Sequence, residues 1–208
     1  LIFDTMGIFW TMKYKNEKDA PLLKEWGLET KELPVKVFIP FGKTEEYKNK
    51  SIPFDATFAL KASELEAEDW VTLFNLDFTN PAGVLIERAI TELKEKGNYT
   101  LSDVDREIES DKKARPETKE IVSALFRGAD TWGIFSKTGE GTEISALTTA
   151  GTTTILDVSV YSSIGAFNIR ALVISLVSRK IFKTRMDARK KEEMQAIQHG
   201  QEYLAYKT

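Results

Sequence analysis

Apolar residues along the chain alternate between short continuous runs and stretches with helical spacing, a pattern typical of an α/β protein. Three short β-type runs are predicted, at residues 1–3, 35–40 and 152–159. Polar turn residues follow the first run, and a proline ends the second. We therefore expect a parallel sheet. Because parallel strands end at the same edge, Asp4 and Asp157 should face one crevice.

Helical spacing dominates the middle of the chain. Four helices and no convincing strand are predicted there, beginning near Ser63, Asn80, Ser102 and Pro116. Asn80 is a good helix cap, Pro81 suits the first helical position, and Ser63 with Glu66 fits a capping box. The apolar stripes of these helices include Trp70, Val84, Leu85, Val104, Ile108, Ile121, Val122 and Phe126.

These patterns divide the chain into three parts. Residues 1–62 form the first part of an α/β core, residues 63–132 a helical insertion, and residues 133–208 the second part of the core. A short helix is expected over residues 19–26. A long one begins near Ala166, with a buried side at Ile169, Leu172, Val173, Leu176, Val177 and Ile181 and a basic distal half.

The composition of the chain excludes several kinds of binding site. The 208 residues carry 29 Lys and Arg against 32 Asp and Glu, a net charge of −3, so any surface that binds nucleic acid must be local. The lack of cysteine and the single histidine, His199, exclude disulfides, cysteine zinc sites, iron–sulfur clusters and multi-histidine metal sites. A cytoplasmic protein is expected. The longest apolar run, residues 171–177, is too short to span a membrane.

Two short motifs resemble motifs of proteins that bind or transfer phosphate. Gly42-Lys43-Thr44 matches the tail of a phosphate-binding P-loop, but too few residues separate it from the preceding strand, and no helix is predicted after it, so a surface turn is expected. Asp4-Thr5-Met6 resembles the Asp-x-Asp motif of haloacid-dehalogenase-like phosphatases, with Met6 in place of the second carboxylate. Asp4 can instead be a turn-forming residue at the strand end.

The basic distal half of the long helix is a candidate DNA-binding surface. Its possible DNA contacts are Arg179, Lys183, Arg185, Arg189 and Lys190. A solvated helix face is the simpler interpretation of this stretch. His199 is expected to be a surface histidine, because Ser and Asp residues elsewhere in the sequence do not indicate a catalytic triad without geometry.

Three segments together resemble the middle of the ATPase domain of HerA/FtsK-type DNA-translocating proteins. They are Leu1-Ile2-Phe3-Asp4-Thr5-Met6-Gly7 with the residues up to Lys13, the strand at 154–159, and the helix from Arg170 to Glu193. The resemblance implies part of a RecA-like parallel sheet with an inserted helical sub-domain. It also implies that the P-loop precedes Leu1 and that the Walker B Asp-Glu follows Thr208. The apolar opening at Leu1 likewise favours a fragment.

The resemblance implies a fragment of an ATP-binding, ATP-hydrolysing DNA translocase or helicase, which works as a homo-oligomeric, hexameric ring on DNA. ATP and Mg²⁺ would bind the full-length protein, and this segment alone would be inactive, with no catalytic residue and no metal ligand. Asp4, Thr5 and Gly7 match the motif near the nucleotide, where Asp4 could hold water around Mg²⁺. Many relatives carry an acidic residue where this chain has Ile8.

Two other functions stay open. The helical segment 63–132 could dock a partner in a non-enzymatic interaction module, and exposed apolar side chains there would favour this alternative. Asp4 could also be the nucleophile of a phosphoryl transfer enzyme.

Overall fold

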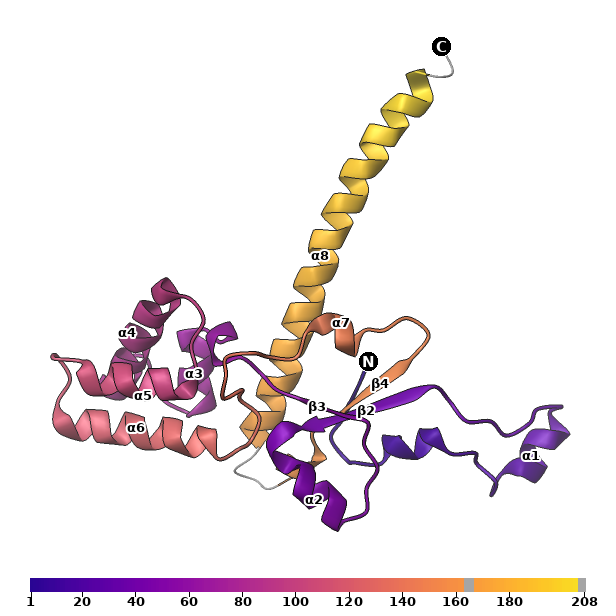
Figure 1. Cartoon of the computed structure of the whole chain (residues 1–208), viewed down its shortest axis with the longest axis horizontal. Coiled ribbons are helices and arrows are strands. Elements are labelled where there is room, and N and C mark those ends of the chain that lie inside the picture. Colours follow the sequence, from indigo (N-terminus) through magenta and orange to yellow (C-terminus); the bar gives the residue numbers. More distant parts are fainter. Residues whose placement is uncertain (163–166, 206–208) are drawn as a thin grey trace. The chain divides into compact units, whose positions relative to one another are not determined.

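The computed structural model describes residues 1–162 and 167–205 and contains a four-stranded, entirely parallel sheet. The strand order is β1-β4-β2-β3 (Figure 1). The strands are β1 (Ile2–Asp4), β2 (Val35–Pro40), β3 (Ala56–Phe58) and β4 (Thr153–Asp157). The chain is therefore an α/β protein with a parallel sheet and a helical part, as the sequence predicts.

The two inner strands form the centre of the sheet core. Val37 and Ile39 of β2 and Ile155 of β4 are fully buried, because strands of a parallel sheet are covered on both faces. The edge strand β3 lies in the region 41–60, to which the sequence analysis assigns no element. It is three residues long and carries an exposed threonine at its centre, so it leaves no recognisable periodicity.

The helices agree with the predicted series, with two additions. They are α1 (Ala20–Glu25), α2 (Thr44–Asn49), α3 (Ala67–Leu73), α4 (Pro81–Lys96), α5 (Leu101–Ser110), α6 (Pro116–Asp130), α7 (Ile144–Leu147) and α8 (Phe167–Ala205). The sequence analysis does not predict α2 or α7. Ala166, the predicted start of the long helix, lies outside the described residues.

Short 3₁₀ turns complete the connections: η1 (Phe9–Lys13), η2 (Phe41–Lys43), η3 (Ala62–Glu64) and η4 (Ser159–Tyr161). The expectation that no helix follows Gly42-Lys43-Thr44 is wrong, because η2 leads directly into α2. Two acidic residues in the first turn of α2 favour this helix start.

The helix caps correct one prediction and confirm another. The Asn80 side chain accepts a hydrogen bond from the Ala82 amide at 3.0 Å, so the cap before Pro81 is confirmed. The predicted capping box of Ser63 and Glu66 is wrong, because Glu66 is itself the N-cap of α3. The backbone amide of Glu66 donates a hydrogen bond to the Asp69 carboxylate. Ser63 belongs to a 3₁₀ turn, so α3 begins one turn later than predicted.

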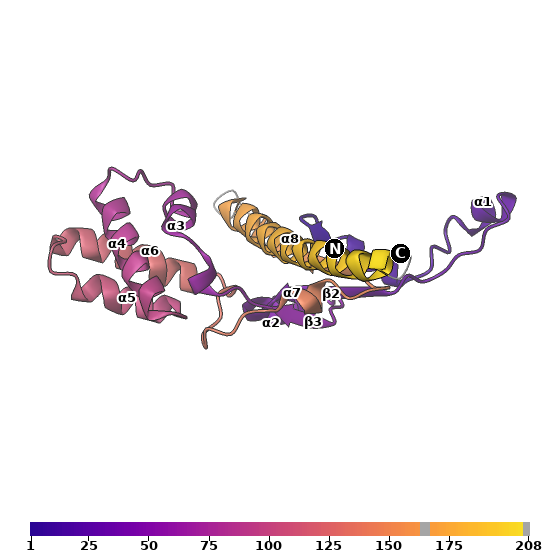
Figure 2. The ribbon, with the colours of Figure 1, turned by 90° about the horizontal axis from the view of Figure 1, so that it is seen from above.

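Helices α3, α4, α5 and α6 form one group (Figures 1 and 2). An aromatic cluster lies in it, with the ring of Trp70 4.9 Å from Phe126 and 5.1 Å from Phe135. Val122 is buried as predicted, whereas Val84 and Ile121 are exposed and so do not belong to the buried stripes. Val84 lies on the face of α4 opposite its buried residues, and Ile121 lies well away from the buried face of α6, so the prediction that both belong to the apolar stripes is wrong.

The chain divides into two compact units, residues 1–172 and residues 173–208. The first unit holds the sheet, the helical group and the start of α8, where Ile169 and Leu172 are buried as predicted. The described part of the second unit is the remainder of α8.

The two connections of the helical group run side by side. Leu60, on the way in, and Phe135, on the way out, form a parallel bridge. The Gly42 amide donates a hydrogen bond to the Gly133 carbonyl at 2.9 Å. A Cβ on Gly42 would lie 2.5 Å from the Cα of Gly133, so this contact requires glycine.

We predict that Gly42→Ala lowers the free energy of unfolding by about 1–3 kcal/mol, the usual cost of forcing an extra carbon into a packed contact. Urea unfolding followed by circular dichroism measures the change. The matched control is Gly128→Ala in α6, where a new Cβ meets no atom within 4 Å. The control should raise the free energy of unfolding by about 0.5–1 kcal/mol, because alanine favours a helix. Equal stability of the two variants would contradict the prediction.

Candidate functional site at the carboxyl edge of the sheet

Two carboxylates lie side by side at the carboxyl ends of adjacent strands. Asp4 ends β1, Asp157 ends β4, and the two are partners in the parallel register. Both side chains are completely buried. The predicted juxtaposition of the two residues is therefore confirmed, and it defines a candidate site at the edge where parallel sheets bind ligands.

Asp4 folds the loop that follows β1. Its Oδ1 accepts hydrogen bonds from the amides of Met6 at 3.0 Å and Gly7 at 2.7 Å, and its Oδ2 accepts one from the Phe9 amide at 2.9 Å. The turn-forming interpretation of Asp4 is confirmed by these bonds. A carboxylate that is buried and bonded to three amides is badly placed to attack a substrate or to hold water around a metal ion.

Gly7 brings this loop against the start of η4. Its φ is +73°, and a Cβ would lie 2.5 Å from the Ser159 hydroxyl and 3.8 Å from Asp157 Oδ2. The loop and the end of β4 therefore touch through a residue that must be glycine, both for its backbone conformation and for space.

The carboxylate of Asp157 accepts fewer hydrogen bonds than that of Asp4. Its Oδ1 accepts the Ser159 amide at 2.9 Å. Its Oδ2 and the buried Tyr47 hydroxyl both meet no hydrogen-bond partner of good geometry among the described residues. Burial raises the pKa of Asp157, and the nearby Asp4 raises it further, although Ser159 and the Tyr47 hydroxyl act in the opposite direction. Burial and the charge of Asp157 also raise the pKa of Tyr47, which stays protonated.

A cation lies at the rim of the site. Arg170, from the first turn of α8, has its Nη1 3.5 Å from the Thr5 carbonyl oxygen. Thr5 is exposed and Met6 is 74 % exposed, so the loop offers its tip to solvent while Asp4 is hidden beneath it. Thr5 and Gly7, two of the predicted residues, thus lie where a ligand could reach the loop.

Sequence reasoning missed three members of this site. Tyr47 lies in a region with no assigned element, so no signal points to it. Ser159 follows a strand-end aspartate by two residues, the spacing of a side chain that receives a backbone hydrogen bond, and could have been found. Arg170 is an early residue of a helix that follows a strand of a parallel sheet, which is also a recognisable place for a site residue.

Gly42-Lys43-Thr44 has no phosphate-binding geometry. The Gly42 amide donates to Gly133, and the Lys43 ammonium lies over the Tyr161 ring, 5.9 Å from its centroid. The backbone donor that a phosphate would need is therefore in use within the fold.

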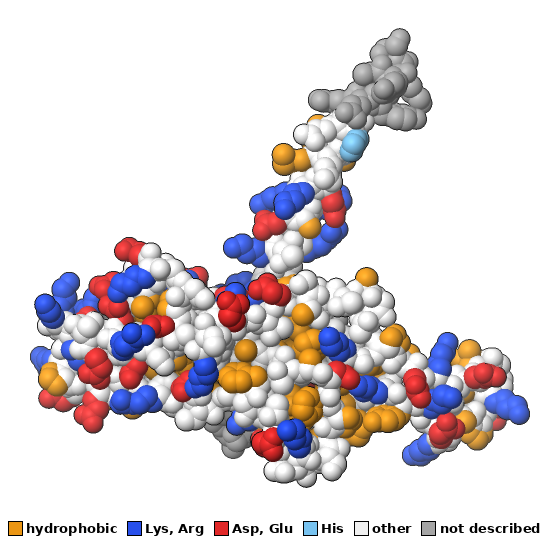
Figure 3. All heavy atoms as spheres, in the orientation of Figure 1, with side chains coloured by type: hydrophobic (Ala, Val, Ile, Leu, Met, Phe, Trp, Pro, Cys, Tyr) orange, Lys and Arg blue, Asp and Glu red, His pale blue; other side chains and the backbone are white. Residues whose placement is uncertain are grey.

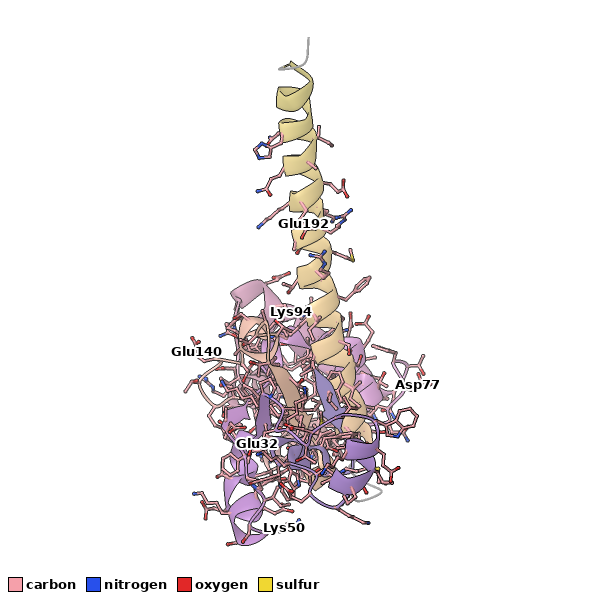
Figure 4. The ribbon with its side chains drawn as sticks, turned by 90° about the vertical axis from the view of Figure 1, so that its right-hand side faces the viewer. Glu32, Lys50, Asp77, Lys94, Glu140 and Glu192 are labelled. Atoms are coloured by element: carbon pink, nitrogen blue, oxygen red, sulfur yellow. The ribbon has the colours of Figure 1, made fainter. Side chains whose placement is uncertain are left out.

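The predicted DNA contacts are exposed on α8, where basic and acidic side chains alternate (Figure 3). Arg185 pairs with Glu192 at 2.7 Å. Arg189 pairs with Glu192 at 3.3 Å and also with Glu193; Glu192 is labelled in Figure 4. These pairs reduce the positive charge of the surface. Arg179, Lys183 and Lys190 complete the predicted set. His199 is also exposed, as expected.

The described residues hold no group of three or more histidine, cysteine or acidic side chains that could bind a metal ion. The acidic pair at the sheet edge does not fit Mg²⁺ by itself, because Asp4 is engaged by amides and Asp157 is buried. Within the same part of the chain, every helix is too short or too polar to cross a bilayer.

Comparison of the chain with protein-family models, with curated proteins and with solved structures finds no match. The geometry of the site and the pattern of the sequence therefore carry the functional argument.

We predict that Asp157→Asn stabilises the protein most at neutral pH. The raised pKa of Asp157 means that its charged form is disfavoured in the folded state. At pH values above that pKa, the charge on Asp157 therefore lowers the free energy of unfolding of the wild type, and this is the cost of ionisation. The cost falls as the pH is lowered through the folded-state pKa and is absent below the unfolded-state pKa of about 3.9. The advantage of the variant should therefore shrink in acid.

Urea unfolding of both proteins between neutral and acidic pH measures this difference. The control is Asp77→Asn, because Asp77 is exposed and its pKa is lowered, chiefly by the Thr79 amide. Asp77→Asn should show no stabilisation at neutral pH. A constant difference between Asp157→Asn and the wild type at every pH would refute the prediction.

Proposed function

We propose that this chain forms the middle part of a RecA-like ATPase domain in a DNA-translocating protein of the HerA/FtsK type. One observation carries the proposal: the first strand of the chain and β4 are parallel neighbours, and both end in a buried aspartate beneath a folded loop. Nucleotides bind at this edge of parallel sheets. The order of strand, helical insertion, strand and long helix is also that of the resembled family.

The role of Asp4 in this proposal is to position the loop. We expected Asp4 to hold water around Mg²⁺, but its oxygens already accept three amides of the loop. The parts that a nucleotide could contact are the exposed Thr5, the backbone near Gly7 and the rim cation Arg170. Arg170 is the side chain that would attract a phosphate charge at this edge.

The remaining machinery belongs, in this proposal, to residues outside the chain. A P-loop before Leu1 and the Walker B carboxylates after Thr208 would hold ATP and Mg²⁺, so this segment alone is not expected to hydrolyse ATP. Sequencing the coding DNA on both sides tests this requirement directly. A homo-oligomeric, hexameric ring on DNA in the cytoplasm also follows from the resemblance and is part of the proposal.

On α8, Lys183 and Lys190 are better candidates for DNA contacts than Arg185 and Arg189. The two arginines are already engaged by acidic residues of the same helix. A phosphate would have to compete with these pairs.

The two alternatives have less support. In the segment 63–132, the large apolar side chains that are exposed among the described residues are Phe78, Val84 and Ile121, which are scattered over two helices and a loop. Single exposed apolar side chains are ordinary on protein surfaces, so they do not favour a docking module. Phosphoryl transfer through Asp4 would need its carboxyl group to be accessible, whereas it is buried.

The proposal predicts that the full-length protein hydrolyses ATP faster when duplex DNA is present. We expect Gly7→Ala to lower this DNA-stimulated turnover at least tenfold, because a Cβ there displaces the loop from Ser159 and alters the nucleotide edge. Gly128→Ala is the matched control and should leave turnover unchanged, since its new Cβ meets open space. Steady-state phosphate release, with and without DNA, measures both.

Absence of DNA-stimulated ATP turnover in the full-length protein would refute the translocase proposal. If turnover is present but Gly7→Ala has the activity of the control, the loop after β1 is not part of the nucleotide site.

A further inference from the structure

A hollow of about 400 Å³ lies in the helical group, away from the carboxyl edge of the sheet. It is formed where α4 and α6 begin and where α5 leads into α6. The polar and charged residues that line it are Thr79, Arg88, Lys113, Arg115 and Thr118. Figure 3 shows basic side chains on the helical group at the end where α5 gives way to α6, with acidic side chains beside them.

The lining of this hollow is basic. Three of its residues, Arg88, Lys113 and Arg115, are basic and none is acidic, but the charge of Arg88 is paired with Asp111. Within the part of the chain that the structure describes, Lys113 and Arg115 form no ion pair. A neighbouring hollow of about 180 Å³ provides a contrast: it shares Arg88 and Lys113 but is also lined by acidic residues, namely Glu92, Glu107 and Asp111. Of these two hollows, the larger is the better suited to an anion.

The shape of the basic turn is fixed by Asp111. Its Oδ1 accepts the amides of Lys113 and Ala114, each at 2.7 Å. Its Oδ2 accepts a hydrogen bond from Nε of Arg88 at 3.0 Å and forms an ion pair with Nη2 of Arg88 at 2.9 Å. Arg88 is therefore held in place against the turn that carries the other two cations. Cations that are positioned before a ligand arrives lose less conformational freedom when they bind it.

The start of α6 adds to the positive potential of the hollow. No side chain caps this 15-residue helix at Arg115, so amide groups of its first turn are available to a ligand. One acidic residue, Glu117, lies in that turn but does not line the hollow. Thr118, in the same turn, does line it, and a threonine hydroxyl can donate a hydrogen bond.

We propose that this hollow binds a phosphate group of a nucleotide or of a nucleic-acid backbone. Arginine offers paired donors to phosphate oxygens, lysine adds a point charge, and threonine hydroxyls complete the contacts. The site belongs to the helical group alone and does not rest on the function proposed for the sheet edge.

The experiment compares Lys113→Ala/Arg115→Ala with a matched control. Lys112→Ala removes a charge from the same turn, but Lys112 lines only the neighbouring acidic hollow and not this one. Isothermal titration with inorganic pyrophosphate, and fluorescence anisotropy with a short labelled DNA duplex at several salt concentrations, give the affinities. Amide shifts of Glu117 and Thr118 in NMR spectra, recorded with pyrophosphate, report contact at the site itself.

We expect the double variant to weaken binding roughly tenfold or more, the loss typical of removing charge-assisted contacts, and Lys112→Ala to change it less than twofold. Tight pyrophosphate binding that depends on Lys113 and Arg115, without a matching effect on DNA, identifies a nucleotide-type ligand. A matching loss for DNA, with a smaller dependence on salt, identifies a nucleic-acid backbone.

The proposal is overturned if neither probe binds, or if Lys112→Ala weakens binding as much as the double variant does. The second result would mean that the general charge of the turn attracts the anion. Unchanged shifts of Glu117 and Thr118 at saturating pyrophosphate would also overturn it. Circular dichroism of each variant verifies that α5 and α6 remain folded.

Discussion

The position of β4 between β1 and β2 is the constraint on which the rest of the first unit depends. Ile155 pairs with Ile2 on one side and with Val37 on the other. Neither pairing is local in the sequence, so the sheet forms only when distant segments meet, at a large cost in chain entropy. Burial of the inner strands offsets this cost. Because β4 lies next to β1, Asp157 also lies beside Asp4, and the two residues form the acidic edge of the sheet.

Burying two neighbouring carboxylates is costly, and the fold treats them differently. Asp4 receives three amides from a loop that winds around it, which compensates a charged group for lost water. Asp157 receives one amide and keeps Oδ2 without a partner of good geometry. Asp4 therefore organises the backbone of the loop, whereas burial raises the pKa of Asp157 and disfavours its charged form.

The sequence predicts the elements whose signals are local. The start of α4 is signalled by Asn80 followed by a proline, and β4 is signalled by a run of β-branched residues. Both signals depend on neighbouring residues alone, and both predictions are confirmed. The edge strand β3 has three residues and the helix α2 has six, of which Tyr47 alone is buried, so neither is long enough to show a periodic pattern in the sequence. Asp4 and Asp157 are predicted to lie together because parallel strands end at the same edge of a sheet, whereas the position of Tyr47 beside them follows only from the folded structure.

The contact between Gly42 and Gly133 shows why a motif needs its surroundings. The letters Gly-Lys-Thr after a strand are those of a phosphate-binding loop, yet here the glycine makes room for another backbone and its amide is already bonded. That close approach joins the strand end of the sheet to the chain leaving the helical group, next to the bridge between Leu60 and Phe135. The two contacts therefore hold the entry and exit of the helical group together at the end of β2, a structural role that the three letters alone do not reveal.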